Sequence, residues 1–144
     1  MKTNIIAGLT GLALAALAAL PSAVLADSAH SLTGTYATSL TQTGVLASPG
    51  TFDGSLRLRV APDGVVSGWY TPADSGQPLS VTGGLRDGSL WLDIGDRGEL
   101  HVNASVTDSG KLVGTATELT GRVTLDGLSG PATFDFVADP TPAN

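Results

Sequence analysis

The sequence predicts an all-β protein built from short antiparallel strands, and three observations support this prediction. Apolar and polar residues alternate with a period of two over many short runs. Turn sequences rich in Asp, Ser and Gly separate these runs at intervals of about 8–12 residues. No segment repeats apolar residues at helical spacing. Together these features favour an all-β sandwich or barrel.

We predict eight strands in order along the chain, at Leu32–Ser39, Gly54–Val60, Val65–Thr71, Leu79–Leu85, Leu90–Asp96, Leu100–Val106, Lys111–Leu119 and Ala132–Ala138. Turn sequences mark their limits at 62–64 (Pro-Asp-Gly), 74–76 (Asp-Ser-Gly), 86–88 (Arg-Asp-Gly) and 108–110 (Asp-Ser-Gly). Glycine takes positive φ at no steric cost, and Asp tolerates tight backbone geometry. Arg122–Leu125 is predicted either to add a short strand or to cap the barrel.

The alternation assigns an inner and an outer face to these strands. Inward positions are Leu56, Leu58, Val60, Leu79, Val81, Gly83, Leu85, Leu90, Leu92, Ile94, Asp96, Leu100, Val102, Ala104 and Val106. One face is therefore apolar and the other polar along nearly every strand. This pattern is what a closed, eight-stranded antiparallel up-and-down β-barrel requires.

Residues 1–26 are predicted to be a cleaved signal peptide. Lys2 precedes an apolar run of 16 residues, Ile5–Leu20, and small residues before Asp27 offer a cleavage site. A membrane-spanning helix needs about 20 apolar residues, so a permanent anchor is disfavoured. We expect a secreted or periplasmic protein with one β-barrel domain at 27–138 and a disordered tail at 139–144.

Composition excludes several classes of function. Removal of Lys2 with the signal peptide leaves six basic and thirteen acidic side chains, a net charge near −7. The only basic cluster is Arg57 with Arg59, so a nucleic-acid surface, or a membrane surface after signal cleavage, is not expected. The chain has no cysteine, which removes disulfides, thiolate metal sites and a thiol nucleophile.

No motif of catalysis or metal binding is present. His30 and His101 are isolated in the sequence, and neither belongs to a zinc-binding pair. The acidic turn around Gly95 and Gly98 lacks the spacing of a calcium loop. A Gly-x-Ser-x-Gly nucleophile motif is absent as well. We therefore expect a non-enzyme with no catalytic residues, no metal ligands and no cofactor.

Four segments resemble the avidin and streptavidin family. They are Ser-Leu-Thr-Gly-Thr-Tyr at 31–36, Gly-Val-Val-Ser-Gly-Trp-Tyr at 64–70, Val-Thr-Gly at 81–83 and Gly-Pro-Ala-Thr-Phe at 130–134. Their order matches the family from Leu32 to Val137. The resemblance implies an avidin-like barrel that holds one small ligand, such as biotin, at its open end.

The resemblance also implies a set of ligand-binding residues. Tyr70 matches the family tyrosine that binds the ureido oxygen of biotin, and Thr38 stands where the family has an asparagine. Asp96 and Thr117 stand where the family has tryptophans, while Leu119 matches a pocket leucine. We predict that these five residues line the site. The alternatives are a core role for Tyr70, a solvated strand end for Asp96 and ordinary strand positions for the two threonines.

Other family contacts with biotin are missing from the chain. Pro72 replaces a hydroxyl residue, Leu100 replaces a further tryptophan, and Ala132 replaces an aspartate. Truncating a buried tryptophan typically costs roughly 2–4 kcal/mol. Three lost rings and several lost hydrogen bonds then remove on the order of 10 kcal/mol from an affinity near the non-covalent limit. We therefore expect weak biotin binding or none.

Trp69 and Trp91 are predicted to lie on the outer face. They flank a strand whose outer residues are Ser80, Thr82 and Gly84, so they would form an exposed apolar patch. Such patches usually mark interfaces. Since the resembled family assembles through outer barrel faces, we predict a homo-oligomer; the alternative is a monomer with both rings flat on the sheet.

The leading functional hypothesis is an exported, non-catalytic barrel that binds a small molecule in an altered avidin-like pocket. The alternative is a structural or protein-interaction barrel that uses its outer tryptophan face. A third hypothesis is an enzyme inhibitor. An open interior that reaches Tyr70 would favour the first, and an interior filled by side chains would favour the second.

Overall fold

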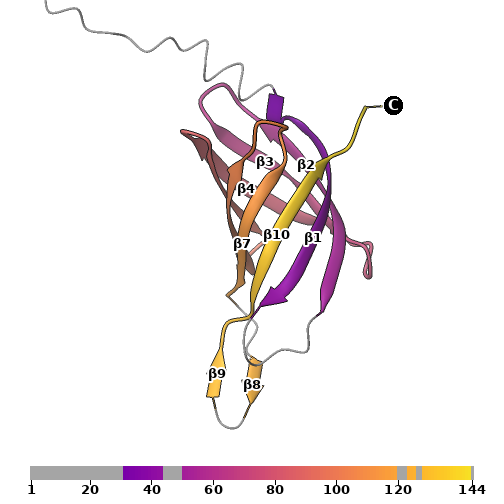
Figure 1. Cartoon of the computed structure of the whole chain (residues 1–144), viewed down its shortest axis with the longest axis vertical. Helices are drawn as coiled ribbons and strands as arrows, with labels where there is room; N and C mark the ends of the chain where they lie inside the picture. The colour runs from indigo at the N-terminus through magenta and orange to yellow at the C-terminus, as the bar shows by residue number, and fades with distance from the viewer. Residues whose placement is uncertain (1–30, 44–49, 120–122, 126–127, 144) are drawn as a thin grey trace, which may run out of the picture.

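The structure is a computed structural model that describes residues 31–43, 50–119, 123–125 and 128–143 (Figure 1). The predicted signal peptide lies outside these residues and stays a prediction. The strands are β1 (Gly34–Thr43), β2 (Thr51–Val60), β3 (Val65–Pro72), β4 (Leu79–Arg86), β5 (Ser89–Ile94), β6 (Leu100–Val106), β7 (Leu112–Glu118), β8 (Val123–Leu125), β9 (Leu128–Gly130) and β10 (Thr133–Pro140).

Eight of these strands form a closed antiparallel barrel. Their order is β1-β10-β7-β6-β5-β4-β3-β2, and β1 closes the wall by pairing with both β2 and β10. β8 and β9 pair separately as a two-stranded ribbon that projects from one end of the barrel (Figure 1). The predicted all-β, eight-stranded up-and-down barrel is confirmed.

The two ends of the barrel differ. The end with the β8–β9 ribbon, here called the ribbon end, also carries the β3–β4 connection at 73–78 and the β5–β6 connection at 95–99. The opposite end, the turn end, has the short β2–β3, β4–β5 and β6–β7 turns. In the β4–β5 turn Asp87 and Gly88 both have positive φ, 50° and 76°, as a two-residue hairpin requires.

The inner face of the barrel is the hydrophobic core. Its buried side chains include Tyr36, Leu56, Leu58, Val66, Tyr70, Val81, Leu92, Ile94, Val102, Leu112, Phe134 and Phe136. Most predicted inward positions are therefore confirmed. Leu32, predicted to begin the first strand, instead lies in a helical turn at the turn end and is 2% exposed. The Tyr36 hydroxyl donates a hydrogen bond of 2.8 Å to the Leu32 carbonyl, so this turn covers the core.

Several strand limits differ from the prediction, and the first strand, β1, runs from Gly34 to Thr43 rather than from Leu32 to Ser39. β2 begins at Thr51 rather than Gly54, so Phe52 belongs to the strand. The predicted segment Arg122–Leu125 contains β8, while Arg122 itself lies outside the described residues. β10 runs to Pro140, two residues into the predicted tail, and the Thr141 amide donates to the Thr35 carbonyl.

Candidate functional site

Thr38 and Tyr70 lie together inside the barrel. Each is 4% exposed, although they come from β1 and β3, which are separated by β2. At this level β2 contributes Gly54, the register partner of Thr38. A Cβ on Gly54 would lie 2.8 Å from Tyr70 Cε2 and 2.9 Å from the Tyr70 hydroxyl oxygen. The lack of a side chain there lets the tyrosine ring reach across β2 toward β1.

The two hydroxyls of this pair are electrostatically linked. Burial raises the pKa of Tyr70 above its usual value, the Thr38 hydroxyl lowers it in part, and Asp74 and Asp53 raise it further. This influence requires a close approach of the two side chains. The Thr38 side chain thus acts on Tyr70 as a nearby hydrogen-bonding group. The contact does not meet the usual distance and angle limits of a hydrogen bond, and by these limits Thr38 Oγ1 is buried without a partner.

An unpartnered buried hydroxyl is costly. Leaving a buried donor or acceptor unsatisfied costs about 1–3 kcal/mol, and most buried polar groups in folded proteins have a partner. Thr38 is therefore a position at which the fold gives up stability. A polar atom of a ligand or a water molecule placed beside Thr38 would recover it.

Apolar side chains surround the ribbon end of the interior. Phe52 on β2 and Phe134 on β10 meet edge to face, with ring centroids 6.0 Å apart. Phe52 is 46% exposed and Leu79, the register partner of Tyr70, is 40% exposed. Sequence reasoning did not assign Phe52 to the site, because the predicted strand began two residues later. The inward period of Leu56 and Leu58, continued backward, would have found it.

Asp96 does not join Thr38 and Tyr70. β5 ends at Ile94, and Gly95, with a φ of 93°, turns the chain. Asp96 is exposed and accepts a hydrogen bond of 2.8 Å from the Ser80 hydroxyl on β4. The inward acidic residue of this end is instead the half-buried Glu118, register partner of Leu100.

Thr117 and Leu119 also lie apart from the pair. Thr117 pairs with His101 on β6 and with Thr133 on β10, both outside positions, while the adjacent Ala116 is buried in the core. Leu119 follows β7, is 61% exposed, and donates its amide to the Glu99 carbonyl. Of the five predicted residues, the structure thus brings together two.

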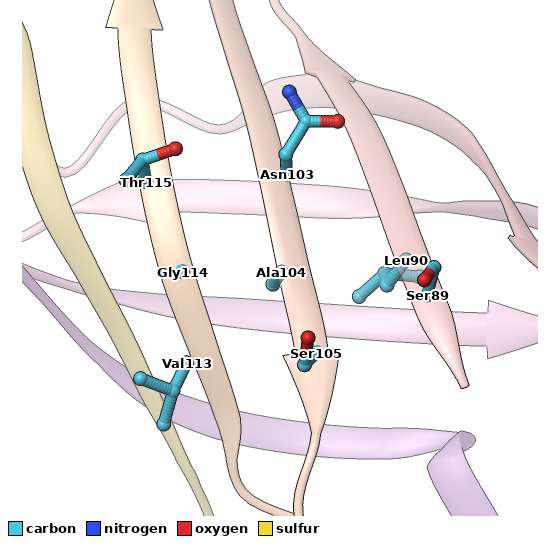
Figure 2. A pocket seen from close by; sticks show the side chains of 8 residues that line it. All are labelled: Ser89, Leu90, Asn103, Ala104, Ser105, Val113, Gly114 and Thr115. Atoms are coloured by element: carbon cyan, nitrogen blue, oxygen red, sulfur yellow. The ribbon is translucent and has the colours of Figure 1, made fainter.

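The outer face of the barrel carries a close histidine–aspartate contact and a shallow hollow. His101 Nδ1 lies 2.6 Å from Asp93 Oδ1, and both side chains are about one third exposed. The hollow, about 260 Å³, lies over β5, β6 and β7 and has Asn103 and Thr115 in its lining (Figure 2). It contains no charged side chain and none of the predicted site residues.

Trp69 and Trp91 lie on the outer face, as predicted. Trp69 is 55% exposed and pairs with Ser80, while Trp91 is 44% exposed and pairs with Gly84. A Cβ on Gly84 would lie 2.6 Å from Trp91 Nε1. The Trp91 ring therefore lies over β4, on the side that faces Trp69.

Comparison with known proteins adds no assignment. No protein-family model matches the chain, and no curated protein sequence matches it. Within the described residues no cluster of three or more His, Cys, Asp or Glu side chains could hold a metal ion. The same part of the chain contains no helix long and apolar enough to cross a membrane.

Proposed function

We propose that this protein is an exported, non-catalytic barrel that binds one small molecule at the ribbon end, with Thr38 and Tyr70 as the polar contacts. The buried Thr38 hydroxyl without a partner carries the proposal. Beside it, the Tyr70 hydroxyl offers a ligand a second donor or acceptor. The resemblance to avidins supports the same end of the barrel as the binding site.

The surrounding side chains limit the size and chemistry of the ligand. Buried side chains fill the interior between Thr38 and the turn end, and Leu40 and Phe134 are also buried on the ribbon side of Thr38. The ligand would therefore bind at the ribbon end against these side chains rather than deeper in the barrel. The partly exposed Phe52 and Leu79 would contact an apolar part of it. Biotin remains a candidate ligand, but with the substitutions described above it would bind weakly.

The second candidate function, a structural or protein-interaction barrel, is favoured by a different observation. Trp69 and Trp91 are among the most exposed large apolar side chains of the described residues, while most of the core behind them is filled. Large exposed aromatic residues are enriched in protein interfaces. The two functions use different surfaces and can coexist in one protein.

Replacing Thr38 tests the ligand site through stability. Thr38→Val removes the unpartnered hydroxyl and keeps the shape, so we expect the free energy of unfolding to rise by about 1 kcal/mol. Urea unfolding followed by tryptophan fluorescence measures it. Thr41→Val, an exposed position on the same strand, is the control and should change stability by less. A Thr38→Val variant less stable than the parent would show that this hydroxyl is satisfied in solution and would remove the basis of the proposal.

Titration calorimetry tests the biotin branch directly. Biotin is added to the parent, to Thr38→Val and to Tyr70→Phe, with protein and ligand at high micromolar concentration. Heat of binding in the parent that is reduced in both variants would support a site at this pair. No heat in the parent would exclude biotin as the ligand.

A further inference from the structure

The charged side chains of the barrel are distributed unevenly between its two ends. The turn end and the adjacent strand halves carry acids and bases together, namely Asp63, Asp87, Asp108 and Asp139 with Arg57, Arg59, Arg86 and Lys111. The ribbon-end half carries Asp53, Asp74, Asp93, Asp96, Glu99, Glu118 and Asp135. Among the described residues its only arginine or lysine is Arg97, and His101 contacts Asp93. The ribbon end is therefore strongly acidic.

This acidic charge acts on the Thr38–Tyr70 pair inside the barrel. Burial is the largest cause of the raised pKa of Tyr70, and the carboxylates of Asp74 and Asp53 raise it further. They do so because a negative charge nearby opposes the loss of the phenol proton. The same field disfavours a bound anion beside the two hydroxyls and stabilises a bound cation.

Glu118 brings one carboxylate to the inner face of this end. It continues the inward series of Leu112 and Ala116 on β7, and it is half-buried. β7 lies four strands from β3 in either direction around the barrel, so Glu118 and Tyr70 come from opposite walls. Among the described residues the Glu118 side chain has no ion pair and no hydrogen bond. A partly buried carboxylate without a partner favours a cation beside it.

We propose that the small molecule bound at the ribbon end is an organic cation, an amine that carries an apolar group. The ligand class rests on the function proposed above, since Thr38 and Tyr70 mark the site. An ammonium group has only hydrogen-bond donors, and the oxygens of both hydroxyls can accept from it. Glu118 supplies the opposite charge from the facing wall. The exposed Phe52 contacts the apolar group, and its ring attracts a cation as well.

Two other classes of ligand fit this end less well. A bare metal ion needs several ligating side chains, and the described residues contain no cluster of three or more such side chains that could hold one. A carboxylate ligand such as biotin would place a further negative charge in an acidic field. An organic amine needs one carboxylate, hydroxyl acceptors and an apolar wall, all of which the ribbon end provides.

Three probes of similar shape and different charge test this preference. They are benzylamine, which is cationic at about pH 7, neutral benzyl alcohol and anionic benzoate. Each is titrated into isotope-labelled protein to about 10 mM, since ligands of this size bind in the millimolar range. The amide shifts of Thr38 and Tyr70 in NMR spectra report binding at the site. We expect benzylamine to bind about fivefold to tenfold more tightly than benzyl alcohol, and benzoate to bind most weakly.

Glu118→Gln removes the inward charge and keeps the side-chain length. It should weaken benzylamine binding about threefold or more and leave benzyl alcohol binding unchanged. Asp108→Asn removes one exposed charge at the turn end, is the matched control and should keep the full preference. Circular dichroism checks that both variants fold. In the parent, about 0.5 M sodium chloride should reduce the preference for benzylamine, because salt screens charges.

The outcomes distinguish a wrong ligand class from a wrong site. Benzyl alcohol or benzoate that binds as tightly as benzylamine would overturn the cationic ligand and leave the ligand site in place. A preference that is unchanged in Glu118→Gln or unchanged by salt would do the same. An absence of shifts at Thr38 and Tyr70 with all three probes would overturn both the ligand class and the site.

Discussion

Tyr36 and Tyr70 are the two tyrosines of the chain, and both hydroxyls lie in largely buried surroundings. Tyr36 donates to the Leu32 carbonyl and helps to cover the turn end, which is a structural role. Tyr70 lies across Gly54 next to a hydroxyl that has no partner. The same residue type therefore covers the core at one end of the barrel and, in the proposed function, contacts the ligand at the other.

These tyrosines predict a loss of stability at high pH. Burial raises both pKa values above 10.0, so the unfolded chain releases these protons before the folded chain does. Their contribution is fully present below about pH 10 and is lost as the pH rises through the folded-state pKa. Urea unfolding midpoints from pH 8 to 11 should fall in the parent and fall less in Tyr70→Phe. An identical pH dependence in both proteins would contradict this prediction.

At the level of strands, local alternation predicted the core of the barrel. It placed Leu92 and Val102 on the inner face, and both side chains are fully buried there. The family resemblance predicted Thr117 and Leu119 in the ligand site, and the structure places both apart from Thr38 and Tyr70. The alternation also predicted that Asp96 points inward, and this is wrong. Gly95 turns the chain and β5 ends at Ile94, so Asp96 lies beyond the strand.

The strands also depend on glycines where neighbouring backbones approach closely. A Cβ on Gly68 in β3 would lie 1.9 Å from the backbone carbonyl oxygen of Arg57 in β2, a contact that only a backbone shift can relieve. A Cβ on Gly34 in β1 would meet nothing within 4 Å. Glycines at such positions let a sheet bend into a closed barrel.

Matched glycine substitutions test this close approach. Gly68→Ala should lower the free energy of unfolding by about 1–3 kcal/mol, the usual cost of forcing extra atoms into a packed site. Gly34→Ala should leave it unchanged or raise it slightly, because alanine restricts the unfolded chain. Urea unfolding of both variants measures the difference. Equal stability of the two would show that β3 can shift away from β2 without cost.

For the whole molecule, the barrel class could be predicted from the sequence, and the Thr38–Tyr70 pair inside the barrel could not. Closure follows from an apolar inner face on nearly every strand, which is visible in the sequence. The Thr38–Tyr70 pair depends on a ring that crosses an intervening strand at Gly54. Such a contact joins three strands, and no local pattern contains it. Similarly, the outward turn of Asp96 toward Ser80 joins residues 16 positions apart.

The last residues of β10 help to close the barrel against β1, although the sequence pattern predicted a disordered tail from residue 139 onward. Pro140 pairs with Tyr36, the Thr141 amide donates to the Thr35 carbonyl, and Lys111 Nζ lies 3.0 Å from Asp139 Oδ1. A chain truncated after Ala138 loses all of these contacts, while one truncated after Thr141 keeps them.

We expect the shorter chain to lose about 1–2 kcal/mol of unfolding free energy, since one backbone hydrogen bond contributes about 1 kcal/mol and the partly exposed ion pair adds little. The longer truncated chain should match the full chain within about 0.5 kcal/mol, because a surface change away from such contacts rarely alters stability by more. Thermal and urea unfolding of the three proteins measure these differences. If both truncated chains unfold like the full one, residues 139–141 do not contribute to closing β10 against β1, and the barrel is held by the pairs up to Ala138 alone.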